Sequence, residues 1–234
     1  MSALAIEVVS GDQLGTRSAQ RIAADLRDAL DVRGRATLAL SGGSTPVPMY
    51  AELARADLPW DLINVFQVDE RIAPDDDPER NIIAIRAALV DNGPVPEHHL
   101  RAMHVVSVDV ETEADRYGAL IRSLTGPSEP PVIDVVQLGL GADGHTASLV
   151  PGDPVLGVVD RPVAVTGEYR GRRRMTLTAP VLSAASSVIW MVAGADKADA
   201  VERLLGSDPT IPASLVHAAS STLLVDQAAA PPNA

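Results

Sequence analysis

The stretch VIDVVQLGLGADGHTASL, residues 132–149, decides the fold class more than any other part of the chain. Residues 132–138 form an apolar run broken by only two polar residues, which predicts a buried strand. Glycines then let the backbone turn tightly, and Asp143 and His145 follow where the strand ends, the usual position of a site in an open α/β sheet. A histidine there can transfer a proton at neutral pH. The alternative is an ordinary strand-to-helix turn whose histidine caps the helix or hydrogen-bonds a carbonyl.

Short apolar runs alternate with helical patterns along the chain. Strands are predicted at residues 36–40, 62–68, 132–140, 187–192 and 221–225, with 103–106 a weaker candidate. Apolar stripes predict helices around residues 22–30, 82–89, 117–124 and 198–205, the last closed by Gly206. We therefore expect an α/β fold, a doubly wound and mainly parallel sheet with helices on both faces.

We expect one α/β domain over residues 1–227, followed by a frayed tail at 228–234 that is rich in alanine and proline. Two proline-rich stretches, 126–131 and 151–162, are interpreted as loops rather than as domain boundaries. Residues 162–166 and 174–178 are a possible hairpin pair.

The composition limits the classes of function. A hydrophobic content of 46% suffices for a full-sized core, and the net charge of -12 opposes binding to nucleic acid or to an anionic membrane. The chain has no cysteine, so its chemistry must come from histidine, carboxylates, arginine or its single lysine, Lys197. The sequence has neither a leader-like N-terminus nor an apolar run of bilayer length, and we expect a cytoplasmic protein.

A second glycine motif, SGGSTP at residues 41–46, follows the predicted strand at 36–40. We expect Thr45 to cap a helix and Pro46 to occupy its first position. Paired glycines before a helix leave N–H groups pointing outward, which suits a phosphate. The alternative is an ordinary turn rich in small residues.

Charged residues gather at two further places. Asp69, Glu70 and Arg71 directly follow the strand at 62–68. Strand alternation directs Asp69 and Arg71 the same way, where they could contact a polar ligand, whereas Glu70 is as readily a solvated residue.

The only basic cluster lies at residues 170–174. Arg170 and Arg172 are expected to be solvated, and Arg173 or Arg174 to reach inward. Lys197 is expected in the opening turn of a helix. Cations beside a glycine loop are what recognition of a small phosphorylated metabolite requires.

Taken together and in this order, these motifs resemble the glucosamine-6-phosphate isomerase/6-phosphogluconolactonase family, and the lactonases most closely. The resemblance covers nearly the whole chain. It implies the fold shared by glucosamine-6-phosphate deaminase and ribose-5-phosphate isomerase. It also implies hydrolysis of 6-phospho-D-glucono-1,5-lactone to 6-phospho-D-gluconate in the oxidative pentose phosphate pathway, without metal or cofactor.

The resemblance also implies roles for individual residues. His145 looks like the base that activates water, Asp143 and Gly144 help to form its turn, and Asp69 and Arg71 contact the lactone or its developing charge. The implied substrate- and phosphate-binding residues are Gly42, Gly43, Ser44, Thr45, Asp143, Gly144, Arg174 and Lys197. Two residues depart from the family pattern: Val150 stands where many relatives carry phenylalanine, and Arg80 where serine is common. They leave the shape of the pocket open.

Two other functions remain as alternatives. An amino-sugar phosphate isomerase or deaminase resembles the same motifs, but such relatives carry an extra carboxylate shortly after the histidine, and residues 148–152 contain none. A sugar-phosphate sensor usually carries a separate DNA-binding domain, for which 234 residues leave no room. We expect a small phosphorylated sugar lactone as partner and favour a monomer.

Overall fold

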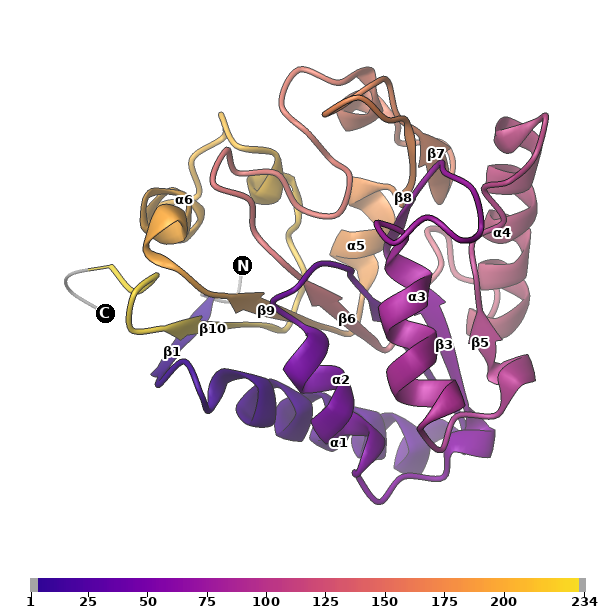
Figure 1. Ribbon diagram of the computed structural model, residues 1–234, viewed down its shortest axis with the longest axis horizontal. Helices are drawn as coiled ribbons and strands as arrows, with labels where there is room; N and C mark the ends of the chain where they lie inside the picture. The colour runs from indigo at the N-terminus through magenta and orange to yellow at the C-terminus, as the bar shows by residue number, and fades with distance from the viewer. Residues whose placement is uncertain (1–3, 232–234) are drawn as a thin grey trace.

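The computed structural model describes residues 4–231, and seven parallel strands form its central sheet (Figure 1). The strands lie in the order β1-β10-β9-β6-β2-β3-β5. Their bounds are β1 Ala5–Val9, β2 Ala36–Leu40, β3 Ile63–Gln67, β5 Leu100–Arg101, β6 Val135–Leu138, β9 Ser187–Val192 and β10 Ser221–Asp226.

Helices cover both faces of this sheet (Figure 1). One face packs against α1 (Leu14–Arg33), α2 (Val47–Ala54) and α3 (Asn81–Arg86), and the other against α4 (Val110–Thr125), α5 (Ala179–Ala184) and α6 (Ala198–Leu205). Side chains of β9 alternate between the two cores, with Ile189 on the first side and Val188 and Trp190 on the second. The expected doubly wound architecture is therefore confirmed.

A small antiparallel sheet, in the order β4-β8-β7, lies beside the main one. It consists of β4 (Asp69–Arg71), β7 (Val163–Val165) and β8 (Arg174–Leu177), and it confirms the predicted hairpin. Short 3-10 or π turns complete the chain: η1 Trp60–Leu62, η2 Ala87–Asp91, η3 Glu97–His99, η4 Pro154–Gly157, η5 Ala195–Lys197 and η6 Pro212–Leu215. Of the helices in residues 4–231, none has the length and apolar character needed to cross a bilayer.

The order of the strands reverses direction at one point of the sheet, between β2 and β6. From β2 the chain builds outward through β3 to β5, whereas from β6 it builds the other way through β9 to β10. Strands β2 and β6 are neighbours, so the loops that follow them diverge. Such a switch point leaves a crevice at the carboxyl ends of the strands.

Several predicted boundaries need correction. The strand expected at residues 132–140 is only Val135–Leu138: residues 132–134 precede it without strand pairing, and the glycine turn begins at residue 139. Residues 103–106 are not a strand: Met103 and Val105 are buried in a loop after the edge strand β5.

The expected frayed tail begins at residue 228, yet Ala229 is fully buried and its N–H donates to Asp226. That contact holds the chain against the end of β10, so fraying does not begin at residue 228. Residues 232–234 of the tail lie outside the described residues.

Candidate active site

A pocket of about 200 Å³ opens at the switch point. Its walls come from the loops after β2 and β6, from β4 and β8, and from the segment between β9 and α6. Most of the residues singled out in the sequence line it, namely Gly42, Gly43, Thr45, Asp69, Arg71, His145, Arg174 and Lys197. Ser44 lines an adjoining pocket, and Asp143 and Gly144 lie in the turn that carries His145. Segments separated by more than 150 residues thus supply one site.

Glycines shape the turn that carries His145. The N–H of Gly141 donates to the His145 carbonyl (2.8 Å), and a Cβ on Gly141 would lie 2.0 Å from His145 Nδ1. Gly144 adopts a φ of +79°, and a Cβ there would lie 2.5 Å from Ile211. No helix follows this turn before η4, so His145 is not a helix cap and the alternative interpretation of the motif is wrong.

Asp143 determines which nitrogen of the neutral His145 ring carries the hydrogen. Its Oδ1 lies 2.5 Å from His145 Nδ1, and its Oδ2 accepts from the Tyr169 hydroxyl at 2.7 Å. Partial burial would raise the pKa of Asp143, but hydrogen bonds from Tyr169 and His145 outweigh it and lower that pKa to about 2. Because an ionised carboxylate only accepts, Nδ1 of the neutral ring carries the hydrogen and Nε2 is left with a free lone pair.

The glycine loop after β2 approaches α3 closely. A Cβ on Gly42 would lie 1.7 Å from Asn81 Oδ1, so only glycine fits, and Gly43 adopts a φ of +102°. The expected helix cap is wrong: Pro46 is the N-cap of α2, and the Thr45 side chain makes no capping bond. Thr45 lines the pocket instead, where its hydroxyl is available to a ligand.

Asp69 and Arg71 face the pocket from β4, as alternation predicted. Asp69 is buried and accepts from Ser148 Oγ (2.5 Å) and Asn81 Nδ2 (3.0 Å). Burial raises the pKa of this carboxyl, against the opposing effects of the Ser148 hydrogen bond and of Arg71. Arg71 Nη1 donates to the Glu79 carbonyl (2.6 Å) and to Asn81 Oδ1, which fixes its guanidinium at the pocket wall.

Glu70 is fully buried, which rules out the solvated position that the sequence left open for it. Its two oxygens accept from the first N–H groups of α3, those of Asn81 (2.8 Å) and Ile82 (3.0 Å). Arg80, one of the departures from the family pattern, is also buried and lies 3.2 Å from Glu70 Oε2. Helix N-termini favour a negative charge, so Glu70 ties β4 to α3 beneath the pocket.

The arginines at 170–174 separate into two kinds. Arg173 pairs with Glu111 (2.9 Å), and Arg172 with Asp77 (2.8 Å) and Glu79, so neither reaches inward. Arg174 is only 8% exposed, its Nε has no hydrogen-bond partner, and no described carboxylate forms an ion pair with it. Burial lowers the pKa of Arg174. The nearby charge of Asp69 acts in the opposite direction without forming an ion pair, so the guanidinium still has N–H donors available to an anion.

Lys197 is the last residue of the short turn η5 and the N-cap of α6. Its ammonium contacts the exposed Asp196 at 2.8 Å, and Lys197 lines the same pocket as Arg71 and Arg174. The pocket therefore holds three cationic side chains in an otherwise acidic protein.

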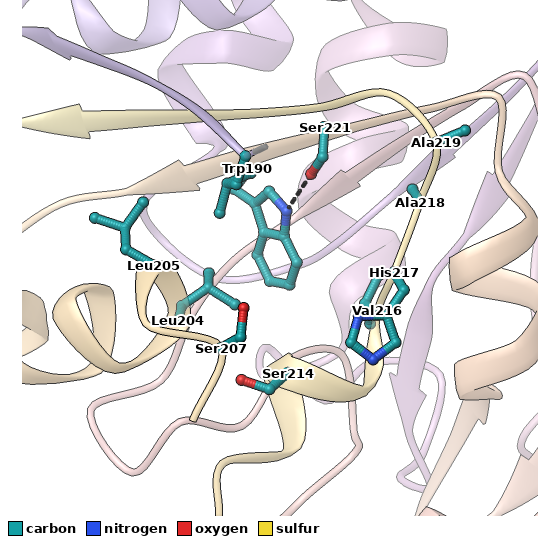
Figure 2. Close-up of a pocket in the computed structure, with 11 residues that line it drawn as sticks. Trp190, Leu204, Leu205, Ser207, Ser214, Val216, His217, Ala218, Ala219 and Ser221 are labelled. Carbon is teal, nitrogen blue, oxygen red and sulfur yellow. Dashed lines mark hydrogen bonds between the residues drawn. The ribbon is translucent and has the colours of Figure 1, made fainter. Parts of the chain in front are cut away.

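A larger hollow of about 360 Å³ lies under α6, away from this site. Figure 2 shows its lining, with Trp190 donating to Ser221 Oγ (3.0 Å) and with Leu204, Leu205 and Val216 on its walls. His217 is its one titratable side chain. The pair of His145 with Asp143, and the cations Arg71, Arg174 and Lys197, belong to the smaller pocket and its turn.

Sequence reasoning did not single out Tyr169 or Ser148. Ser148 lies within the glycine motif and Tyr169 directly before the basic cluster, but their contacts with Asp69 and Asp143 are long-range and invisible in the sequence. A tyrosine beside an Arg-Gly pair at the tip of a predicted hairpin is the one pattern that could have drawn attention to Tyr169.

A parallel sheet with a histidine–carboxylate pair and three cations at its switch point defines an α/β enzyme. The chain belongs to the family of glucosamine-6-phosphate isomerases and 6-phosphogluconolactonases, whose model matches residues 10–225. A 6-phosphogluconolactonase from Nostoc sp. is 41% identical over 190 residues, 80% of this chain and 79% of that protein.

Solved structures of the same family have the same fold. The 6-phosphogluconolactonase from Trypanosoma brucei superposes with a TM-score of 0.87 at 25% identity, over 98% of both chains. A monomeric glucosamine-6-phosphate deaminase, 21% identical, shares the fold with a TM-score of 0.79 over 97% of this chain and 98% of that one.

Proposed function

We propose that this enzyme hydrolyses 6-phospho-D-glucono-1,5-lactone to 6-phospho-D-gluconate, the lactonase step of the oxidative pentose phosphate pathway. The observation that carries the proposal is the Nε2 of His145, held as a base by Asp143, in a pocket with three cations. The names of the curated relatives agree with this reaction.

His145 acts as the general base. Its Nε2 takes a proton from a water molecule whose oxygen attacks the lactone carbonyl, and Asp143 stabilises the imidazolium that forms. When the tetrahedral intermediate collapses, the bond from the carbonyl carbon to the ring oxygen breaks and the imidazolium returns its proton to that oxygen. A base of this kind contributes about 10²- to 10⁴-fold.

The three cationic side chains of the pocket have two different roles. Arg71, held beside Asp69, stabilises charge that develops on the carbonyl oxygen. Gly42, Gly43, Ser44, Thr45 and Lys197 hold the distal phosphate, and Arg174 completes the phosphate-binding side of the pocket. Binding energy from the phosphate fixes the carbonyl against the water.

Deamination of an amino-sugar phosphate is disfavoured by the groups near the turn. Ser148 is buried against Asp69, and the next carboxylate, Asp153, accepts from the backbone of Val155 (2.8 Å) and Gly167 (2.9 Å). Neither offers a further proton carrier beside His145. A non-catalytic sensor has no need for an oriented base.

The direct test is a coupled assay. The phosphorylated lactone is generated enzymatically from glucose 6-phosphate, and acid release at neutral pH is compared with the spontaneous rate. We expect strong acceleration with this substrate, much less with unphosphorylated glucono-1,5-lactone, and no ammonia from glucosamine 6-phosphate. Acid release at the spontaneous rate, or measurable ammonia, contradicts the proposal.

We also propose that the enzyme works as a monomer in the cytoplasm.

A further inference from the structure

The hairpin between β7 and β8 ends in a tight turn over the active site. Tyr169 and Arg172 pair as an antiparallel bridge, with N–H to carbonyl distances of 2.9 and 3.3 Å. Between them, Arg170 and Gly171 adopt positive φ angles of +52° and +78°. Two consecutive positive φ angles at the tip of a hairpin are typical of a type I′ turn, which fixes the direction of the flanking side chains.

This turn places Tyr169 against the catalytic pair. Its hydroxyl donates to Asp143 Oδ2 at 2.7 Å, while Asp143 Oδ1 contacts His145 Nδ1. The Tyr169 ring meets the His145 ring edge to face, with 5.6 Å between centroids. The guanidinium carbons of Arg174 and Arg170 lie 5.0 and 5.1 Å from the Tyr169 ring centre.

We propose that Tyr169 is a positioning residue for the hydrolysis, holding the Asp143 carboxylate so that Oδ1 stays on His145 Nδ1; this inference rests on the proposed function. The Asp143 side chain is 35% exposed, so without a second anchor it can rotate toward water. With Tyr169 on Oδ2, the carboxylate keeps one orientation, and the imidazole keeps Nε2 toward the pocket.

Tyr169 serves as a donor throughout the working range. Partial burial and the neighbouring Asp143 raise the pKa of its phenol, so the hydroxyl stays protonated. By donating to Oδ2 it also draws charge away from Asp143, which weakens the pull of that carboxylate on the imidazolium. The other charged groups facing the pair are Arg174, Arg170, Asp69, Arg71 and Lys197.

Substitution Tyr169→Phe isolates the hydroxyl because the ring and its two arginine contacts remain. We expect kcat to fall about 3- to 10-fold, the effect of one lost hydrogen bond, while KM changes less than 2-fold. Because Asp143 regains negative charge, the acid limb of the pH–rate profile moves to higher pH. If Tyr169 only supported the fold, its substitution would not move the pH profile and would not lower kcat while leaving KM unchanged.

A substrate-free measurement separates this proposal from the proposed function. In ¹⁵N NMR, the wild-type His145 ring shows its hydrogen on Nδ1, and Tyr169→Phe shows a mixture of tautomers with protonation at higher pH. Glu168→Gln, exposed and adjacent, leaves the kinetics and the spectrum unchanged. A Tyr169→Phe enzyme with wild-type kcat, pH profile and His145 signals overturns the proposal, whatever the substrate proves to be. Thermal unfolding of the variants confirms that each is folded.

Discussion

At the scale of single residues, the proposed catalysis depends on a carboxylate that forms no bond to the substrate. Asp143 sits behind His145, and its pKa of about 2 keeps it ionised while the imidazole gains and loses a proton. An arginine or lysine at the same place would repel the imidazolium. The orientation of one ring is therefore a property of two residues in one turn.

Substitution Asp143→Asn tests this dependence. The amide can donate to Nδ1, which moves the ring hydrogen to Nε2, so kcat is expected to fall about 10²- to 10⁴-fold. Loss of the negative charge also moves the acid limb to lower pH, opposite to Tyr169→Phe. Asp160→Asn, exposed and remote, is the control. A variant that keeps more than a tenth of wild-type kcat contradicts the role given to Asp143.

Lys197 carries a separate prediction about binding. Lys197→Met keeps the alkyl stem and removes the charge, so the KM for the phosphorylated lactone is expected to rise about 10- to 100-fold, the effect of one lost charge-assisted contact. The matched control is a substrate: kinetics with unphosphorylated glucono-1,5-lactone stay unchanged. Equal losses on both substrates assign Lys197 to the fold or to the chemistry instead of to the phosphate.

At the scale of elements, the buried ion pair Glu70–Arg80 joins the small sheet to α3. Removing one partner of a buried pair typically costs about 3 to 5 kcal/mol, because the other charge is left uncompensated. We expect a loss of this size for Glu70→Gln in urea unfolding. Asp75→Asn, whose carboxylate also pairs with Arg80 but is 86% exposed, is expected to cost less than about 1 kcal/mol. A small loss for Glu70→Gln contradicts the anchoring role.

The same elements show what sequence patterns can and cannot predict. Strands β2 and β9 match their predicted residues because a strand buried on both faces is a continuous apolar run. Strand β4 was not predicted, because its residues, Asp69–Arg71, are all charged and are stabilised by partners far along the chain. The edge strand β1, Ala5–Val9, was also missed, because it is short and only partly buried.

For the site, residue type and position after a strand were enough to find His145, Asp69, Arg71 and the glycine loop. Pattern alone left Arg173 and Arg174 open and the resemblance implied Arg174; the register of the hairpin decides which of the two turns inward. Burial of Glu70 was unpredictable for a related reason: its partners are N–H groups of a helix that begins eleven residues later.

At the scale of the whole molecule, a net charge of -12 surrounds a pocket that presents Arg71, Arg174 and Lys197. Specificity for an anion is thus local, built at the point where strands β2 and β6 diverge. We expect a monomer, for which size-exclusion chromatography with light scattering would give 24.5 kDa. A stable dimer whose dissociation abolishes activity contradicts this prediction.

The central claim is that the Nε2 of His145 removes a proton from water beside a lactone held by its phosphate. The most direct measurement is the steady-state hydrolysis of the phosphorylated lactone by His145→Ala, with binding of 6-phosphogluconate followed by calorimetry. His104→Ala, an exposed histidine outside the pocket, is the control. We expect kcat to fall about 10²- to 10⁴-fold with product binding nearly unchanged. Turnover by His145→Ala at the wild-type rate would contradict it.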